Sequence, residues 1–249
     1  TMAKNHKQLL ASAFSKAAGS YDSVAEFQRN TGHQLLAQID NLLAQPHQAD
    51  TAVPVWLDLG SGTGYFSDLL SQTGAQVYGV DIAFGMLQHA KAHRSPRINW
   101  LNGDAEALPL ADNSVDLVFS SLALQWCDDL NVALAEIRRV LKPGGRLAFT
   151  TLVSGSLVEL KQAWRAVDTQ RHVNGFLSMD KIAQSADSAH FSAVTLDVRP
   201  EVLLYQTPLA LLKDLKGIGA NHVQTDKVKA GLGGKQALLK MSQAYEAFR

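Results

Sequence analysis

The stretch VWLDLGSGTGYF, residues 55–66, decides the fold. An apolar run leads into Asp58, and glycines at every second position, Gly60, Gly62 and Gly64, follow before a helical pattern begins. Glycine allows a tight turn and lets a ligand approach the backbone where a Cβ atom would clash. The pattern therefore predicts a strand, a ligand-binding loop and a helix in succession.

The spacing of the glycines indicates which class of ligand this loop holds. The dinucleotide fingerprint is G-x-G-x-x-G, with a pyrophosphate at the helix N-terminus. Here the spacing is G-x-G-x-G, and Asp58 stands two residues before the first glycine. A carboxylate there would repel a pyrophosphate but attract an ammonium or sulfonium group, which disfavours an NAD-dependent oxidoreductase. The loop resembles the S-adenosylmethionine loop of class I methyltransferases, although a glycine loop alone is also typical of a structural turn.

Short apolar segments alternate with helical patterns along the middle of the chain. We expect strands at residues 55–60, 76–80, 98–103, 115–120 and 146–152. Helical patterns lie near residues 65–73, 84–93 and 130–141. Such alternation predicts a doubly wound, mostly parallel α/β sheet, the Rossmann-like fold of class I methyltransferases. The motif LKPGGRL predicts a helix end with Lys142 in the last turn.

Helical patterns also flank the predicted sheet. The first fifty residues read as helices, the second of them capped by Asp22. Beyond residue 152 we expect helices over 153–190, a sixth strand over 194–206 and further helices over 208–249. This organisation predicts an N-terminal helical lid (1–50), a cofactor-binding core (51–152) and a helical acceptor-side insertion (153–249) within one structural domain. A class I sheet ends in an antiparallel strand beside the fifth, and we expect that final strand to be absent.

Composition excludes several classes of protein. Among 249 residues, Lys and Arg total 23 and so do Asp and Glu, which argues against a basic nucleic-acid binder. The single cysteine, Cys127, forms no internal disulfide and is best interpreted as packing, in keeping with a reducing compartment. No apolar run approaches the roughly 18 residues of a membrane span. We expect a cytoplasmic protein without membrane or nucleic-acid partners.

Two later acids fit the same cofactor. Asp81, followed by Ile82, ends the second expected strand, where a carboxylate can accept both ribose hydroxyls. Asp104, followed by Ala105, comes after the third strand, and in the methyltransferase family the corresponding acid reads the adenine amino group. Either acid alone is also typical of a helix cap or a solvated turn. Together at the carboxyl ends of parallel strands they predict the crevice in which doubly wound folds bind ligands. The resemblance to class I methyltransferases implies that this ligand is S-adenosylmethionine, with S-adenosylhomocysteine as product.

Six further stretches resemble, in order, the malonyl-acyl-carrier-protein O-methyltransferase family of biotin synthesis. They are FSKAAGSYDSVAEFQ (14–28), SSLALQWCDD (120–129), SGSLVELKQAW (154–164), HVNGFLS (172–178), LKDLKGIGANH (212–222) and AYEAFR (244–249). The resemblance implies methylation of the free carboxylate of a malonyl group on acyl carrier protein. The resulting methyl ester would start pimeloyl synthesis for biotin.

The implied chemistry needs few catalytic groups. A carboxylic acid titrates at about pH 4, so the acceptor is already an anion at neutral pH and requires no general base. Orientation and exclusion of water would then supply the catalysis. Side chains expected to contact the acceptor are Tyr21, Ser121, Trp126, His172, Asn174 and Lys216, and Ser121 and Leu122 would also border the cofactor. Each has an ordinary alternative, such as a packed aromatic for Tyr21 and Trp126 or a solvated cation for Lys216.

The expected partner, acyl carrier protein, is typically acidic and would favour a basic docking surface. One patch is Arg138, Arg139 and Lys142; another is the segment 208–249, with seven basic and three acidic residues, net +4. Two rival functions stay open. One is a class I methyltransferase that acts on a free small molecule such as a quinone precursor, and the other is a non-catalytic module that binds the cofactor or the carrier protein.

Overall fold

The computed structural model describes residues 7–8, 10–12, 14–15, 26–43, 52–167, 175–217 and 232–248, with the backbone only at 41–43, 213–217 and 232–235. Contacts divide the chain into two compact units. The first joins Thr1–Leu152 to Leu177–Leu196, and the second joins Val153–Phe176 to Asp197–Arg249. The first unit contains the sheet and every expected cofactor residue.

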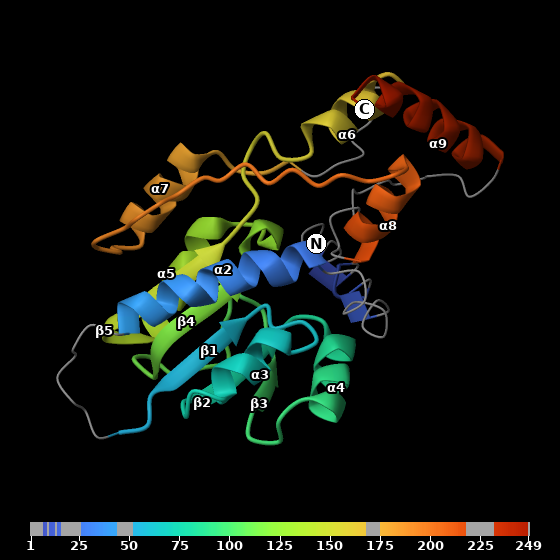
Figure 1. Cartoon of the computed structure of the whole chain (residues 1–249). Coiled ribbons are helices and arrows are strands. Elements are labelled where there is room, and N and C mark those ends of the chain that lie inside the picture. Colours follow the sequence, from blue (N-terminus) through green and yellow to red (C-terminus); the bar gives the residue numbers. More distant parts are fainter. Residues whose placement is uncertain are drawn as a thin grey trace. The chain divides into compact units, whose positions relative to one another are not determined.

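A five-stranded parallel sheet forms the centre of the first unit (Figure 1). Its strands are β1 (Val55–Leu59), β2 (Gln76–Asp81), β3 (Asn99–Asn102), β4 (Val115–Ser121) and β5 (Leu141–Thr150). The strand order is β3-β2-β1-β4-β5. The chain therefore moves outward from β1 in one direction and returns to start again at β4, as doubly wound folds do. The predicted fold class is confirmed.

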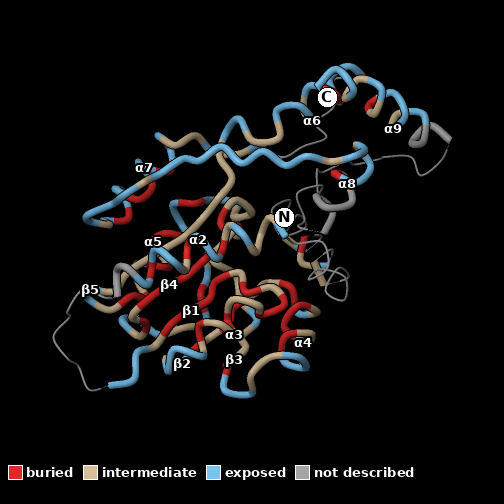
Figure 2. The backbone as a smooth tube through the Cα atoms, in the orientation of Figure 1, coloured by how far each residue is buried: buried red, intermediate tan, exposed pale blue. Residues whose placement is uncertain are grey.

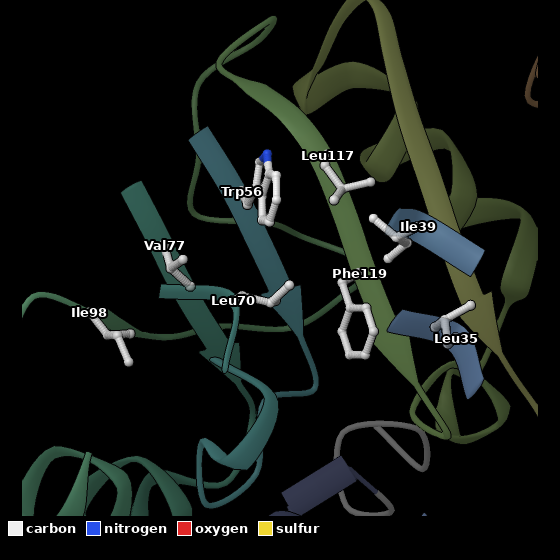
Figure 3. Close-up of a cluster of buried hydrophobic side chains, with 8 residues drawn as sticks. All are labelled: Leu35, Ile39, Trp56, Leu70, Val77, Ile98, Leu117 and Phe119. Atoms are coloured by element: carbon white, nitrogen blue, oxygen red, sulfur yellow. The ribbon is translucent and has the colours of Figure 1, made fainter. Parts of the chain in front are cut away.

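Helices connect the strands and cover the sheet. They are α2 (Glu26–Leu43), α3 (Tyr65–Ser71), α4 (Phe84–His93) and α5 (Leu130–Val140). Leu35 and Ile39 of α2 and Leu70 of α3 pack against strand side chains that include Phe119 (Figure 3). This cluster, with Trp56, Val77, Ile98 and Leu117, shows that α2 and α3 cover one face.

The opposite face of the sheet is buried as well. Side chains alternate between the two faces along a strand, so Leu57 and Val118 point away from the cluster that contains Trp56 and Phe119. Leu57 and Val118 are nevertheless fully buried, and Figure 2 shows that the backbone of β1 and β4 is mostly buried. Helix α5 contacts β5, and a right-handed connection from β4 to β5 places it on this face. Helix α4, which contacts β2 and β3, lies on the side of α3, because the amide of Ser95 just after α4 donates to Asp68 of α3. A sheet covered on both faces explains why its strands read as nearly continuous apolar runs.

The end of α5 differs from the prediction. The helix begins at an Asp129 cap, whose carboxylate accepts a hydrogen bond from the Asn131 amide at 2.8 Å. It ends at Val140, because Leu141 already pairs with Val115 in the sheet. Lys142 therefore lies in β5 and not in the last helical turn, and its ammonium binds the Asp116 carboxylate at 2.9 Å.

One more helix belongs to the first unit. Helix α7 (Met179–Ser188) begins at Ser178, whose hydroxyl accepts a hydrogen bond from the Lys181 amide, and it contacts α5. The helical pattern expected over 153–190 is thus at least two separate helices, α7 and α6 (Val158–Arg165) of the second unit. Asp22, expected to cap the second helix, lies outside the described residues.

The second unit is helical. Helix α9 (Leu232–Tyr245) contacts both α6 and α8 (Pro208–Gly217), and a short 3₁₀ turn, η2 (Glu246–Phe248), follows it. Leu160, Ala163, Leu211 and Met241 are the buried apolar side chains described in these helices. None of the described helices is both long enough and apolar enough to cross a bilayer.

The expected sixth strand at 194–206 is wrong. This stretch has no regular secondary structure, and Val198, Val202 and Leu204 are exposed, Leu204 to 93%. Its alternating apolar pattern suits an extended backbone. A strand also needs a neighbour to complete its hydrogen bonds, and no described residue pairs with it.

Candidate cofactor site

The glycine loop adopts the conformation that its sequence predicts. Gly60, Gly62 and Gly64 have φ angles of 75°, 54° and 79°, in the left-handed region that favours glycine. The amides of Gly60 and Ser61 donate to the Val80 carbonyl at 2.8 and 3.1 Å, which ties the loop to the end of β2. A Cβ atom at Gly60 would overlap the side chain of Ala123.

Asp81 joins this loop to the next helix. Its Oδ2 accepts a hydrogen bond from the Gly62 amide at 2.8 Å, and its Oδ1 accepts one from the Ala83 amide at 2.7 Å. Burial raises the pKa of Asp81, and the two backbone donors oppose that effect. The carbonyls of Asp81 and Ile82 both accept from the Asn102 side chain. One carboxylate thus holds together two of the segments that the sequence assigned to the cofactor.

Asp58 has a different position from Asp81. It is 3% exposed, and its Oδ2 accepts a hydrogen bond of 2.5 Å from the hydroxyl of Ser67 in α3. Burial raises its pKa to about 7; the Ser67 hydroxyl opposes this shift and the charge of Asp81 adds to it. Asp58 therefore fixes the start of α3 against β1. Its carboxyl group gains or loses a proton near neutral pH.

Asp104 lies in an ion-pair cluster that the sequence did not reveal. Its Oδ1 accepts from the Glu106 amide at 3.0 Å, and its Oδ2 accepts from the ammonium of Lys7 at 2.6 Å. Lys7 also binds Glu106 at 2.5 Å. Glu106 in turn accepts from the amides of Asp128 and Asp129. Lys7 was missed because it belongs to no recognisable motif and lies 97 residues from Asp104.

The junction SSLALQWCDD (120–129) leaves the end of β4 beside the glycine loop. Phe119 is in register with Asp58, and the Ser120 hydroxyl donates to the Leu59 carbonyl at 2.8 Å. The direction of the sheet order reverses between β1 and β4, and doubly wound folds bind ligands at such a point. Ser120 and the glycine loop therefore lie where a ligand is expected.

Within this junction, the expected acceptor residues have protein partners. The Ser121 hydroxyl lies 3.0 Å from that of Thr150, and the Leu122 amide donates to the Thr150 carbonyl at 2.9 Å. Leu122 adopts a left-handed φ of 53°, which turns the chain sharply after β4. Trp126 meets the ring of Phe14 edge to face, with centroids 6.3 Å apart.

The other polar and sulfur groups of the junction are held in place. The Gln125 side chain donates to the Leu122 carbonyl and accepts from the Thr151 hydroxyl, so it braces the turn. Burial raises the pKa of the Cys127 thiol to about 12, and the nearby charge of Glu106 adds to the effect. Cys127 is therefore a neutral thiol at neutral pH, in keeping with the packing role expected for it.

The comparisons with known proteins agree with this geometry. Residues 57–149 match the family model described as a methyltransferase domain. A malonyl-acyl-carrier-protein O-methyltransferase of Yersinia pestis is 44% identical over 239 residues, covering 96% of this chain and 84% of the relative. The chain belongs to the malonyl-acyl-carrier-protein O-methyltransferase family.

A larger relative and a solved structure are also similar to this family member. The biotin biosynthesis bifunctional protein BioHC of Cellvibrio japonicus is 42% identical over 243 residues, covering 98% of this chain and 47% of that larger protein. A solved complex of the Haloferax volcanii Trm112 methyltransferase activator with a methyltransferase matches with a TM-score of 0.59 and 24% identity. That match covers 83% of this chain and 93% of the other, and it confirms the fold.

The acceptor side of this O-methyltransferase family member is described only in part. Tyr21, His172 and Asn174 lie outside the described residues, and Lys216 lies in α8 with its backbone alone described. Ala105 is half-buried next to Asp104. In the described ranges, no three His, Cys, Asp or Glu side chains are grouped so that they could hold a metal ion.

Acidic side chains largely neutralise the expected basic patch of Arg138, Arg139 and Lys142 at the end of α5 and the start of β5. Arg139 binds the carboxylates of Glu136 and Asp112 at 2.8 and 2.7 Å, and it donates to two backbone carbonyls. Lys142 binds Asp116. Because acids offset two of the three cations, the patch offers an acidic partner less charge than its sequence indicates.

Proposed function

We propose that this protein transfers a methyl group from S-adenosylmethionine to the free carboxylate of malonyl-acyl carrier protein. The observation that carries the proposal is the 44% identity to a malonyl-acyl-carrier-protein O-methyltransferase across 96% of the chain, which includes the helical segments outside the cofactor core. The product would be the malonyl methyl ester. The name of the bifunctional relative supports a place for this reaction in biotin synthesis.

The residues present at the carboxyl end of the sheet fit the cofactor. Gly60, Gly62 and Gly64 leave the loop backbone open to a ligand, and Asp81 offers carboxylate oxygens for ribose hydroxyls. The buried hydroxyl of Ser61 has no hydrogen-bond partner in the described part of the chain, so this loop retains an unused polar group. Asp104 would accept a hydrogen bond from the adenine amino group. When bound, S-adenosylmethionine supplies an electrophilic methyl group on its sulfonium.

The chain's own contribution is to bind the cofactor and the acceptor, to orient them toward each other and to exclude water from between them. The acceptor carboxylate is ionised at neutral pH, so no residue needs to remove a proton from it. An anion taken out of water must find hydrogen-bond donors, because an unpaired buried charge is costly. The proposed hydrogen-bond donors and walls of the acceptor site are Ser121 at the end of β4, Trp126 in the junction after it, and Tyr21, His172, Asn174 and Lys216. Positioning of this kind can supply about 7–11 kcal/mol of the barrier reduction.

The proposed partner is acyl carrier protein, and the basic segment 208–249 is its proposed docking surface. Of the two basic regions, this segment is the better supported, because acids already pair with Arg139 of α5 and with Lys142 of β5. Steering of an acidic carrier by a basic surface raises the association rate and weakens with salt. We also propose a cytoplasmic location, which suits a chain with a single cysteine.

Mass spectrometry of the carrier protein tests the proposal. Malonyl-acyl carrier protein should gain one methyl group on incubation with enzyme and S-adenosylmethionine. Acetyl-acyl carrier protein, which lacks the free carboxylate, should gain none. Methylation of a quinone precursor but not of the carrier would favour the small-molecule alternative. Cofactor binding without methylation of either substrate would favour a non-catalytic module.

A further inference from the structure

The N-terminal segment contacts three of the cofactor segments through different residues. Lys7 binds Asp104 and Glu106 after β3. Phe14 packs against Ala83 and Met86 near the start of α4, and it also meets Trp126 in the junction after β4. These contacts come from one short stretch of sequence, so the segment fastens together loops that are distant along the chain.

A further contact places the same segment at the start of α4. The amide of Gly85 donates to the Ser15 hydroxyl at 3.0 Å. A side chain at position 85 would overlap the Cβ and backbone of Ser15, so only glycine allows this approach. The helix has no side-chain cap at Ala83, and Ser15 therefore satisfies one of its free amides.

We propose that Lys7 is a positioning residue in the cofactor site: its ammonium orients the Asp104 carboxylate toward the adenine amino group. The inference rests on the proposed function, because it requires Asp104 to bind adenine. The geometry supports it: Asp104 Oδ1 is fixed by the Glu106 amide and Asp104 Oδ2 by Lys7, so both oxygens have set directions. Each carboxylate oxygen retains a lone pair for a further donor.

Charge explains why a cation is needed at this place. The carboxylates of Asp104, Glu106 and Asp128 surround the Lys7 ammonium at 2.6, 2.5 and 3.8 Å. Without Lys7, these like charges would repel one another and turn apart. The backbone amides that donate to Glu106 would hold it in place, so Asp104 would be the acid that moves.

The cluster is strong enough to act as a fixed part of the site. The Lys7 side chain is 19% exposed, so solvent screens its ion pairs only in part. Burial lowers the pKa of Lys7, but the hydrogen bonds to Asp104 and Glu106 and the negative charges of these two acids together raise it by more. The pKa of Lys7 therefore lies above its usual range, and the ammonium stays charged throughout the pH range of an assay.

Calorimetric binding of two product analogues tests this role. S-adenosylhomocysteine carries the adenine amino group, and S-inosylhomocysteine carries an oxygen in its place. The variants are Lys7→Met, which removes the charge at similar length, and Lys7→Arg, which keeps it. Lys91→Met, an exposed lysine of α4, is the matched control. Circular dichroism establishes that each variant is folded, and Lys7→Gln replaces Lys7→Met if the latter is not.

The wild type should bind S-adenosylhomocysteine more tightly than the inosyl analogue. Lys7→Met should lower the affinity for S-adenosylhomocysteine by about tenfold, because the contact with the adenine amino group is lost. The affinity for the inosyl analogue should stay nearly the same. Lys7→Arg should restore most of the preference, and Lys91→Met should match the wild type. In turnover, Lys7→Met should raise KM for S-adenosylmethionine and leave KM for the carrier substrate unaltered.

Two results would overturn the inference. In one, Lys7→Met leaves both affinities as they are in the wild type. In the other, it weakens both analogues equally, which would make Lys7 a general clamp without a role in reading adenine. If the wild type itself binds no S-adenosylhomocysteine, the proposed function fails as well. The wild-type measurement therefore separates failure of the inference from failure of the proposed function.

Discussion

At the scale of single residues, Asp58 near the end of β1 and Asp81 at the end of β2 have different hydrogen-bond partners. Asp58 is buried against the Ser67 hydroxyl, whereas Asp81 accepts two backbone amides from the segments on either side of it. The sequence placed Asp58 just before the glycine loop and Asp81 at the end of the second expected strand, and it could not show which of the two carboxylates is bound by a core side chain. We therefore expect Asp58 to affect mainly the stability of the fold and Asp81 to affect mainly the binding of the cofactor.

Replacing Asp58 by Asn should make stability less dependent on pH. The pKa of Asp58 is about 7 in the folded chain, above its ordinary value, so the folded state holds a proton that the unfolded chain releases. Its contribution to the free energy of unfolding is therefore greatest in acid and is lost as the pH rises toward 7. Asp58→Asn should be more stable than the wild type by roughly 1–3 kcal/mol at about pH 8 and similar to it at about pH 5.

Thermal unfolding of the ligand-free protein at both pH values measures this difference. The exposed Asp187→Asn variant serves as the control and should follow the wild type at each pH. An Asp58→Asn curve parallel to that of the wild type would show that Asp58 is ionised without cost in the folded protein.

Replacing Asp81 by Asn should weaken cofactor binding more than stability. An amide has one acceptor oxygen, so one of the amides of Gly62 and Ala83 would lose its partner, at a cost of about 1–3 kcal/mol in unfolding free energy. The charged acceptor for ribose would also be lost. We expect S-adenosylhomocysteine to bind at least tenfold more weakly in calorimetry, as charge-assisted hydrogen bonds are strong.

Asp116→Asn is the matched control for Asp81. Asp116 also accepts a backbone amide, that of Val55, but at the opposite end of the sheet. Its replacement should lower the melting temperature and leave the affinity for S-adenosylhomocysteine intact. Equal losses of affinity in the two variants would mean that Asp81 acts through stability alone.

At the scale of elements, the glycine loop after β1 and the irregular part of β5 between Leu141 and Arg146 each contain glycine in the left-handed conformation. Gly60 and Gly144 have nearly equal φ angles of 75° and 77°. A side chain at Gly60 would also overlap Ala123, whereas no atom in the described part of the chain lies within 4 Å of a Cβ position at Gly144. The pair therefore separates backbone strain from steric overlap.

Gly60→Ala should destabilise the protein more than Gly144→Ala. The left-handed conformation costs about 1–2 kcal/mol for a residue with a Cβ atom, and both variants incur it. Overlap with Ala123 adds about 1–3 kcal/mol at position 60 and displaces the loop from the end of β2. Chemical denaturation measures the two free energies of unfolding. Equal losses would contradict the close approach between the loop and the junction after β4.

The sequence reveals those elements whose signals lie within a few neighbouring residues, and it does not reveal features that depend on contacts between distant residues. The strands and the loop could be predicted, because apolar runs and glycine spacing are local signals. The sixth strand could not be excluded, since the alternation of Val198, Val202 and Leu204 does not reveal whether a neighbouring strand exists. The end of α5 depends on the pairing of Leu141 with Val115, and the position of Lys7 depends on an acid 97 residues away.

At the scale of the whole molecule, the chain separates a sheet unit from a helical unit. The sheet unit contains all the expected cofactor residues, and the helical unit contains α8 with its two lysines, Lys213 and Lys216. Family membership extends over both units, because the Yersinia pestis relative matches 96% of the chain. A role in recognising the acceptor is therefore proposed for the second unit and can be tested separately from cofactor binding.

Lys213 and Lys216 should affect different steps. Both lie on α8, three residues apart in the sequence. If Lys213 steers an acidic carrier, Lys213→Glu should raise KM for malonyl-acyl carrier protein about tenfold at low salt, with less effect at high salt. It should leave the kinetics with malonyl-coenzyme A unaltered. If Lys216 pairs with the acceptor carboxylate, Lys216→Gln should lower kcat/KM for both substrates.

The exposed Lys91→Glu variant in α4 is the control for the charge reversal, because it changes the net charge equally in the sheet unit. It should leave both substrates unaffected. A rise in KM for the carrier in Lys91→Glu as large as that in Lys213→Glu would assign the effect to net charge rather than to a docking surface. Loss of activity with malonyl-coenzyme A in Lys213→Glu would instead place Lys213 at the acceptor, since that substrate has no carrier protein to steer.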